Sequence, residues 1–259
     1  MIRRLLNIQF ARLKRQKIVY LFFVVMAVMI ISNALGLAGS FEDHDMSNFD
    51  TENFAADYYA GGKFPTMCMQ SYVDIVGTLF LSFISAVLIC GEKASGMFRQ
   101  PLLNGVSKKQ LLTAKTVSIL TVALICFLFV VIVSIVTGFL LWGSQIFDSA
   151  QEYLLQMLLL VFPQTTLVLF LVFLSLYMSN ISSMMCASLI ILLVNNLFSQ
   201  FFGSYIALID FMYYLYAFSG YNGMELTGRM IVLGIAVNVI TGVILVYGIN
   251  RRLLFTPCQ

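Results

Sequence analysis

Charged residues are scarce in this chain, making up 10% of its 259 residues, whereas 60% are hydrophobic. Soluble domains carry charge on about a quarter of their residues. No polar stretch is long enough to form a soluble domain with a core of its own. The composition therefore excludes an ordinary soluble protein and indicates one embedded in a lipid bilayer. Because the basic residues flank apolar segments, they also argue against nucleic acid as a partner.

The residue types that hydrolytic enzymes need are also few. The single histidine, His44, lies in a polar stretch between apolar segments, so no Ser–His pair forms within the membrane and no HExxH zinc motif exists. The nearest approach to a phosphate loop is Gly62-Lys63, where Phe64 replaces the required Ser or Thr. We expect no catalytic, metal or cofactor site in this chain. Nucleotide-driven work would need ATP and magnesium on a different polypeptide.

Basic and acidic residues occupy different segments. Of the 15 Lys and Arg, all but Lys63 and Arg229 lie before the first apolar segment, between the second and third, or after the last. Most acidic residues lie in the intervening stretches. Cytoplasmic loops of membrane proteins are enriched in Lys and Arg. The basic segments and both termini are therefore predicted to face the cytosol.

Uncharged runs predict an all-α integral membrane protein with six transmembrane helices in one domain, residues 1–259. A crossing helix needs about 20 mostly apolar residues. Four runs fit one crossing each, and the run 153–209 suits two, divided by the polar cluster 179–183. An even number of spans keeps Arg251 and Arg252 on the side of the basic N-terminal segment. The predicted spans are 18–39, 72–91, 115–142, 154–178, 183–205 and 228–250, with extracellular loops at 40–70 and 206–227.

Residues 1–17 predict a basic amphipathic helix. An apolar stripe at spacings of three and four faces away from most of the Lys and Arg residues, as in helices that lie in the membrane interface. It serves either as a simple topology anchor or in a more specific role. The stripe comprises Ile2, Leu5, Leu6, Phe10 and Leu13.

The predicted inner loop between the second and third spans has its own helical signals. A short helix from about Glu92 is expected to stop at Pro101, because proline cannot continue a helix. Asn104-Gly105 indicates a turn. Ser107 followed by Gln110 forms a capping box that begins the next helix. Apolar residues in this loop need a partner surface, either lipid headgroups or another protein. These are Met97, Phe98, Leu102 and Leu103.

This loop resembles the first inner loop of type 2 ABC transporter permeases, although Asn104-Gly105 stands where many relatives carry a proline. The matching residues are Glu92, Gly96, Leu102, Leu103, Val106, Ser107, Lys108, Lys109, Gln110, Leu111, Leu112 and Lys115. The resemblance implies that residues 92–103 form a coupling helix on a separate ATPase subunit, present in two copies, and that a second permease, identical or related, completes the path. The short length suggests the bacteriocin-immunity (lantibiotic) or antimicrobial-peptide export branch. The coupling residues implied are Glu92, Gly96, Met97, Phe98, Arg99, Leu102 and Leu103.

Polar residues within the spans and acids outside them suggest where a substrate binds. Gln164, Asn195, Asn196 and Asn238 either line a translocation path or make hydrogen bonds between helices. The outer loop's acids would attract a cationic amphipathic peptide, or they collect outside merely because basic residues collect inside. These are Asp43, Asp45, Asp50 and Glu52.

Two functions remain open from the sequence. The first is the permease of an ATP-driven exporter that moves an amphipathic or hydrophobic substrate, such as a peptide or drug-like molecule, by alternating access. The alternative is a secondary transporter or channel-like six-span protein with no ATPase partner. Ion-coupled transport usually needs ionisable residues at membrane depth, and the interiors of the predicted spans carry none.

Overall fold

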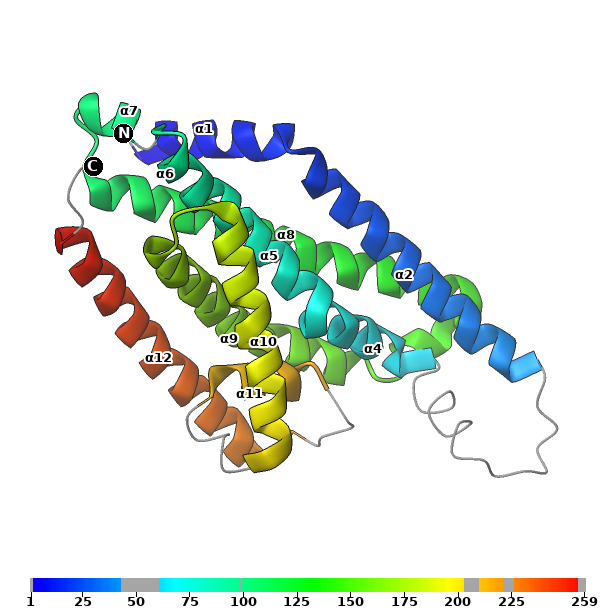
Figure 1. The fold of residues 1–259 in the computed structure, drawn as a ribbon. Coiled ribbons are helices and arrows are strands. Elements are labelled where there is room, and N and C mark those ends of the chain that lie inside the picture. The colour runs from blue at the N-terminus through cyan, green and yellow to red at the C-terminus, as the bar shows by residue number, and fades with distance from the viewer. Residues whose placement is uncertain (1, 43–60, 98, 203–209, 221–225, 256–259) are drawn as a thin grey trace.

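In the computed structural model, every regular element of the described residues is a helix (Figure 1). The structure describes residues 2–42, 61–97, 99–202, 210–220 and 226–255. Over this part of the chain, five helices are long and apolar enough to cross a membrane. The helix α10 (Ile181–Phe202), of 22 residues, stands where a sixth span was predicted. The prediction of an all-α membrane protein is confirmed.

The N-terminal segment folds as predicted, into the amphipathic helix α1 (Ile2–Arg15). It lies across one end of the molecule, and the first span, α2 (Lys17–Glu42), leaves it at an angle after a break at Gln16 (Figure 1). Leu5, Gln9 and Leu13, spaced by four residues, are buried. This face of α1 therefore packs against protein rather than lipid.

The second span is one continuous helical run that begins earlier than predicted. Pro65 lies in the first turn, where its missing N–H is not needed, so helix occupies the last part of the predicted 40–70 loop. Two π-helical segments interrupt the α-helical geometry. The side-chain hydroxyl of Thr78 donates a hydrogen bond to the Val73 carbonyl, five residues earlier, at 3.0 Å. The run comprises η1 (Gly61–Lys63), α4 (Phe64–Ser71), η2 (Tyr72–Val76), α5 (Gly77–Ser85), η3 (Ala86–Gly91) and α6 (Glu92–Ala94).

The third span begins at the predicted capping box. Ser107 accepts a hydrogen bond from the Gln110 N–H at 3.2 Å, and the Gln110 side chain accepts one from the Ser107 N–H at 3.3 Å. The helix α8 (Lys108–Trp142) then runs 35 residues and is followed by η4 (Gly143–Phe147). It packs against α1, α2, α4, α5 and the fourth span, α9 (Ala150–Tyr177). The helix α8 therefore joins the two N-terminal helices to the second and fourth spans.

The predicted 206–227 loop contains a further helix, α11 (Phe211–Phe218). Asp210 caps it by accepting a hydrogen bond from the Met212 N–H at 2.9 Å. Its buried aromatic residues Tyr214 and Phe218 pack where Gly234 removes the side chain from the last span, α12 (Gly228–Phe255). Eight residues are too few to cross a bilayer, so α11 is a cap on the bundle rather than a span.

The two ends of the bundle differ in charge. One end carries α1, α6, the short helix α7 (Arg99–Leu103) and the C-terminal part of α12, and we call it the basic end (Figure 1). The helices α4 and α11 lie at the opposite end.

Between the ends, the outer faces of α2 and α12 expose large apolar side chains, as a bilayer requires. Val24, Val28, Ile240 and Ile244 are each 59–63% exposed.

Candidate functional site

A buried ion cluster at the basic end joins three helical elements. Glu92, at the end of the second span, accepts from Arg12 of α1 at 2.6 Å and is paired with Lys115 of α8 at 2.6 Å. The side chains of Lys115 and Glu92 are 0% and 7% exposed, and that of Arg12 is 38% exposed. Lys115 also donates to the Leu88 carbonyl. This arrangement fixes α1 against the ends of two spans.

Next to the ion cluster, a small apolar core supports the inner loop. Leu5 of α1 packs with Val106, Leu111 and Ala114, and Leu102 of α7 lies against this group. The loop that follows α7 is therefore held between the amphipathic helix and the start of α8. Both ends of the segment Ser95–Leu103 are attached to buried structure.

The segment itself does not form the single helix that the sequence predicts. Helix α6 ends at Ala94, and Gly96 turns the chain with a φ of +70° that strongly favours glycine. Helix α7 then includes Pro101 as its third residue, where a missing N–H is tolerated. The prediction that the helix stops at Pro101 is therefore wrong. The turn residue is Gly96, and proline lies within the first turn of a second short helix.

The residues to which the family resemblance assigns a coupling role fall into two groups, one exposed and one facing the bundle. Met97 is 42% exposed and Leu103 is 85% exposed, so both present apolar surface away from the bundle. Glu92 and Leu102 instead face inward, into the ion cluster and the small apolar core. Gly96 has open space where a Cβ would stand, so it serves the turn rather than a close approach. Phe98 lies outside the described residues, as does the side chain of Arg99.

Lys93 makes a contact that the sequence analysis missed. Its ammonium group donates to the carbonyls of Ser175, Leu176 and Met178, at 3.1, 2.9 and 3.1 Å. These are carbonyls at the end of α9 that lack a helical N–H partner, and a cation there also complements the helix dipole. The neighbours Glu92 and Lys93 therefore tie the base of the inner loop to α1, α8 and α9.

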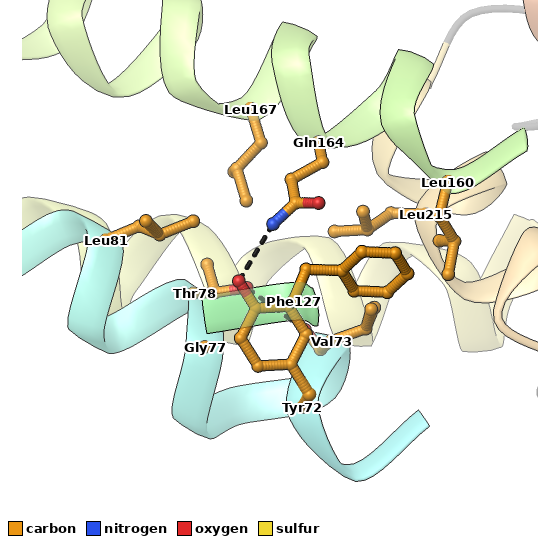
Figure 2. Close-up of a pocket in the computed structure, with 10 residues that line it drawn as sticks. All are labelled: Tyr72, Val73, Gly77, Thr78, Leu81, Phe127, Leu160, Gln164, Leu167 and Leu215. Carbon is orange, nitrogen blue, oxygen red and sulfur yellow. Dashed lines mark hydrogen bonds between the residues drawn. The ribbon is translucent and has the colours of Figure 1, made fainter. Parts of the chain in front are cut away.

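Gln164 makes hydrogen bonds between helices at membrane depth. Its amide donates to the Tyr72 hydroxyl at 2.8 Å (Figure 2). It also donates to the Ala123 carbonyl at 3.3 Å, so that Gln164 links α9 to η2 and α8. The enclosed space beside these groups measures about 10 Å³, room for about one water molecule. In this conformation Gln164 therefore holds helices together and faces no open path.

Asn238 borders a wider groove. A groove of about 490 Å³ lies between α9 and α12, with apolar walls and three polar residues, Thr165, Thr166 and Asn238. Asn238 donates to the Gly234 carbonyl at 2.8 Å, and Thr166 donates to the Asn238 carbonyl at 3.3 Å. Among the predicted path residues that the structure describes, Asn238 lines this groove.

The remaining predicted residues lie near or beyond the limits of the described chain. Asn195, on α10, hydrogen-bonds to Asp210 at the start of α11. Burial raises the pKa of Asp210, while hydrogen bonds from the backbone of Met212 and Tyr213 and from Asn195 lower it. The side chain of Asn196 is outside the described residues. So are all four acids predicted to contact substrate, Asp43, Asp45, Asp50 and Glu52.

Residues 5–178 match the sequence profile of the ABC-2 family of transporter proteins. This chain belongs to the ABC-2 transporter family. The match covers α1, the ion cluster, the inner loop and the first four spans. An ABC-2 protein is the membrane subunit of an ABC transporter and works with an ABC ATPase, so the predicted family and the predicted kind of partner agree with the match. No curated protein and no solved structure matches the chain.

Proposed function

We propose that this ABC-2 permease is the membrane subunit of an exporter in the bacterial cell membrane, with its basic end facing the cytosol. Two copies of a separate ATPase, which carries the ATP and magnesium, bind at this end. A second permease, identical or related, completes the transport path. The orientation follows from the basic residues, since cytoplasmic segments are enriched in Lys and Arg.

The observation that carries this proposal is the construction of the inner loop. Met97 and Leu103 expose apolar side chains on this loop, and this exposure supports their role as a contact surface for the ATPase. Its base is fixed by Glu92 to α1 and α8, and by Lys93 to the end of α9. A displacement of the loop by the closing ATPases is therefore passed to several helices at once. Alternating access follows from their joint movement.

The substrate class we propose is amphipathic or hydrophobic, such as a membrane-active peptide or a drug-like molecule. The groove between α9 and α12 supports this choice, because apolar walls with a few polar groups suit such a ligand.

Export is tested by measuring the survival of cells exposed to a candidate substrate. Cells that express the transporter should tolerate a cationic membrane-active peptide better than cells that express a version whose ATPase cannot hydrolyse ATP. Equal survival would contradict export of that peptide class.

The coupling role is tested with the double variant Met97→Asp/Leu103→Asp. Both side chains are exposed, so the purified permease should keep its melting temperature. In membranes that contain the complete transporter, the variant should lose both association with the ATPase and stimulation of ATP hydrolysis. The control Lys14→Asp adds an acid at another exposed position of the basic end and should keep both properties. An intact complex in the double variant would rule out this segment as the docking surface.

A further inference from the structure

The groove beside Asn238 continues toward the basic end. A second groove, of about 320 Å³, lies where the start of α8 meets α9 and α12, and both grooves are lined by Leu169 and Val246. An α-helix turns by about 100° per residue, so lining positions spaced by one and three residues stay on one side of α12. These positions include Asn238, Gly242, Val243, Val246, Ile249 and Asn250. The two grooves therefore form one continuous groove, which we call the long groove.

The long groove is long enough to hold an apolar chain that crosses one leaflet. From Asn238 to Asn250 it runs about 18 Å along the axis of α12, whereas half of the hydrocarbon core of a bilayer is about 15 Å thick. Val243 and Val246 are 65% and 43% exposed, so the groove is open toward the lipid. At Gly242 a Cβ would meet only the Leu169 side chain, at 3.8 Å, so the glycine leaves room at the middle of the groove. An apolar chain can therefore enter sideways from the bilayer.

The two ends of the long groove differ in what they offer a polar group. At the basic end it is lined by Lys109, Thr113 and Asn250, and the first two are exposed. At the far end, the Thr166 hydroxyl donates to the Asn238 carbonyl at 3.3 Å, and the Asn238 amide donates to the Gly234 carbonyl at 2.8 Å. The polar groups at the far end thus already donate to the protein backbone. A polar head is better accommodated at the basic end, with the apolar chain directed toward Asn238.

The charge at the basic end of the long groove favours an anionic head. Among the residues that line it in the described part of the chain, Lys109 is the charged one. In the segments 91–115 and 250–259 the sequence holds one acidic residue, Glu92, which is paired with Arg12 and Lys115. Lys115 lies about 240° around α8 from Lys109, so this carboxylate is held on another side of the helix. Basic pockets between transmembrane helices on the cytoplasmic side bind anionic headgroups.

We propose that the long groove binds an anionic amphiphile with one long apolar chain, its head at Lys109, Thr113 and Asn250 and its chain along Leu169 and Val246. The amphiphile enters from the leaflet at the basic end rather than from water. It is then the substrate of the transporter, a role that rests on the proposed export function. Within the substrate class proposed above, the groove selects an anionic head, because a cationic peptide would meet a like charge at Lys109.

Binding is tested with the purified full chain in a neutral detergent, examined by native mass spectrometry. The ligands are lysophosphatidylglycerol, lysophosphatidylcholine with the same acyl chain, and lysophosphatidylglycerol with a short chain. The first should bind in preference to the other two. Lys109→Gln should weaken its binding about fivefold and leave lysophosphatidylcholine unaffected. The control Lys14→Gln removes another exposed charge from the basic end and should change neither. Equal binding of the two heads, or equal effects of the two variants, would overturn the site.

A second set of variants leaves every charge in place. Val246→Trp should fill the long groove where its two parts meet and weaken binding of lysophosphatidylglycerol about tenfold or more. Gly242→Leu should do the same from the middle of the groove. Val25→Trp is the matched control, because Val25 lies on the outer face of α2 and is 40% exposed against 43% for Val246. Unchanged binding in both groove variants, or an equal loss in Val25→Trp, would contradict the proposal.

Transport is measured separately, with the complete transporter in liposomes and fluorescent lysophosphatidylglycerol. ATP should drive the amphiphile out of the leaflet at the basic end, and Val246→Trp should slow this movement whereas Val25→Trp should not. Specific binding without ATP-driven movement would contradict the export function and the substrate role while leaving the site. ATP-driven movement that Val246→Trp does not slow would overturn the groove as the substrate route and leave the exporter in place.

Discussion

At the scale of single residues, Glu92 is important because its carboxylate is paired with Lys115, whose side chain is fully buried. A buried ion pair adds little net stability, since desolvation offsets its attraction, but removing one partner leaves an uncompensated charge. Glu92→Gln should therefore destabilise the purified chain by about 3–5 kcal/mol, measured by thermal unfolding in detergent. The double variant Glu92→Leu/Lys115→Met should recover much of this loss. Arg12→Gln should cost much less because Arg12 is partly exposed, and an equal cost would contradict the arrangement.

Gln164 provides a second test at this scale. Gln164→Leu should destabilise the bundle by about 1 kcal/mol, because hydrogen bonds between membrane helices are individually modest. In a double-mutant cycle with Tyr72→Phe, the two changes should cost less together than the sum of their separate costs. The neighbouring Thr165→Val, whose hydroxyl bonds within its own helix, is the control and should show no coupling to Tyr72. Strict additivity of Gln164→Leu and Tyr72→Phe would contradict the bond.

At the scale of elements, the inner loop depends on the backbone at Gly96. Gly96 has a φ of +70°, and nothing lies near the position where a Cβ would stand. A side chain at this position is therefore unfavourable because of the backbone conformation and not because of a steric clash with neighbours. Gly96→Val should cost about 1–2 kcal/mol and reduce ATPase stimulation. Gly96→Asn should cost less, because asparagine adopts this conformation more readily. Matching effects of the two variants would indicate that side-chain size, rather than backbone conformation, sets the requirement.

The sequence predicts the long elements and misses the short ones. Uncharged runs locate the spans, and the Ser107–Gln110 capping box is confirmed because both of its hydrogen bonds are local. The π-helical segments cannot be recognised from the amino-acid composition. A π turn differs from an α turn in the spacing of its backbone hydrogen bonds, not in the residue types that it uses. The helix α11 is too short to be recognised among aromatic residues that also suit a loop. For the ion cluster a signal existed: Glu92 and Lys115 are opposite charges at the ends of consecutive predicted spans, and so at a similar depth.

At the scale of the whole molecule, orientation remains a prediction from charge. Reporter fusions after Gln100 and Asn180 should be read as cytoplasmic, and one after Ser149 as external. The physical reason is that translocating the basic segments across the membrane is disfavoured. Fusion at residue 259 provides the decisive control for the number of spans. An external reading there would exclude an even number of crossings.

The two π-helical segments in the second span also constrain how this chain tolerates insertions and deletions. A π turn holds one residue more than an α turn, and one residue corresponds to about 100° of rotation around an α-helix. Removing a single residue between Ala86 and Gly91 would let this turn become α-helical and would keep position 92 directed toward Lys115, because the π turn had held that extra residue within one full turn. A frame-preserving deletion in this part of the gene should therefore be tolerated better than one within α8, where no wide turn absorbs the loss and the residues beyond it would rotate by about 100°.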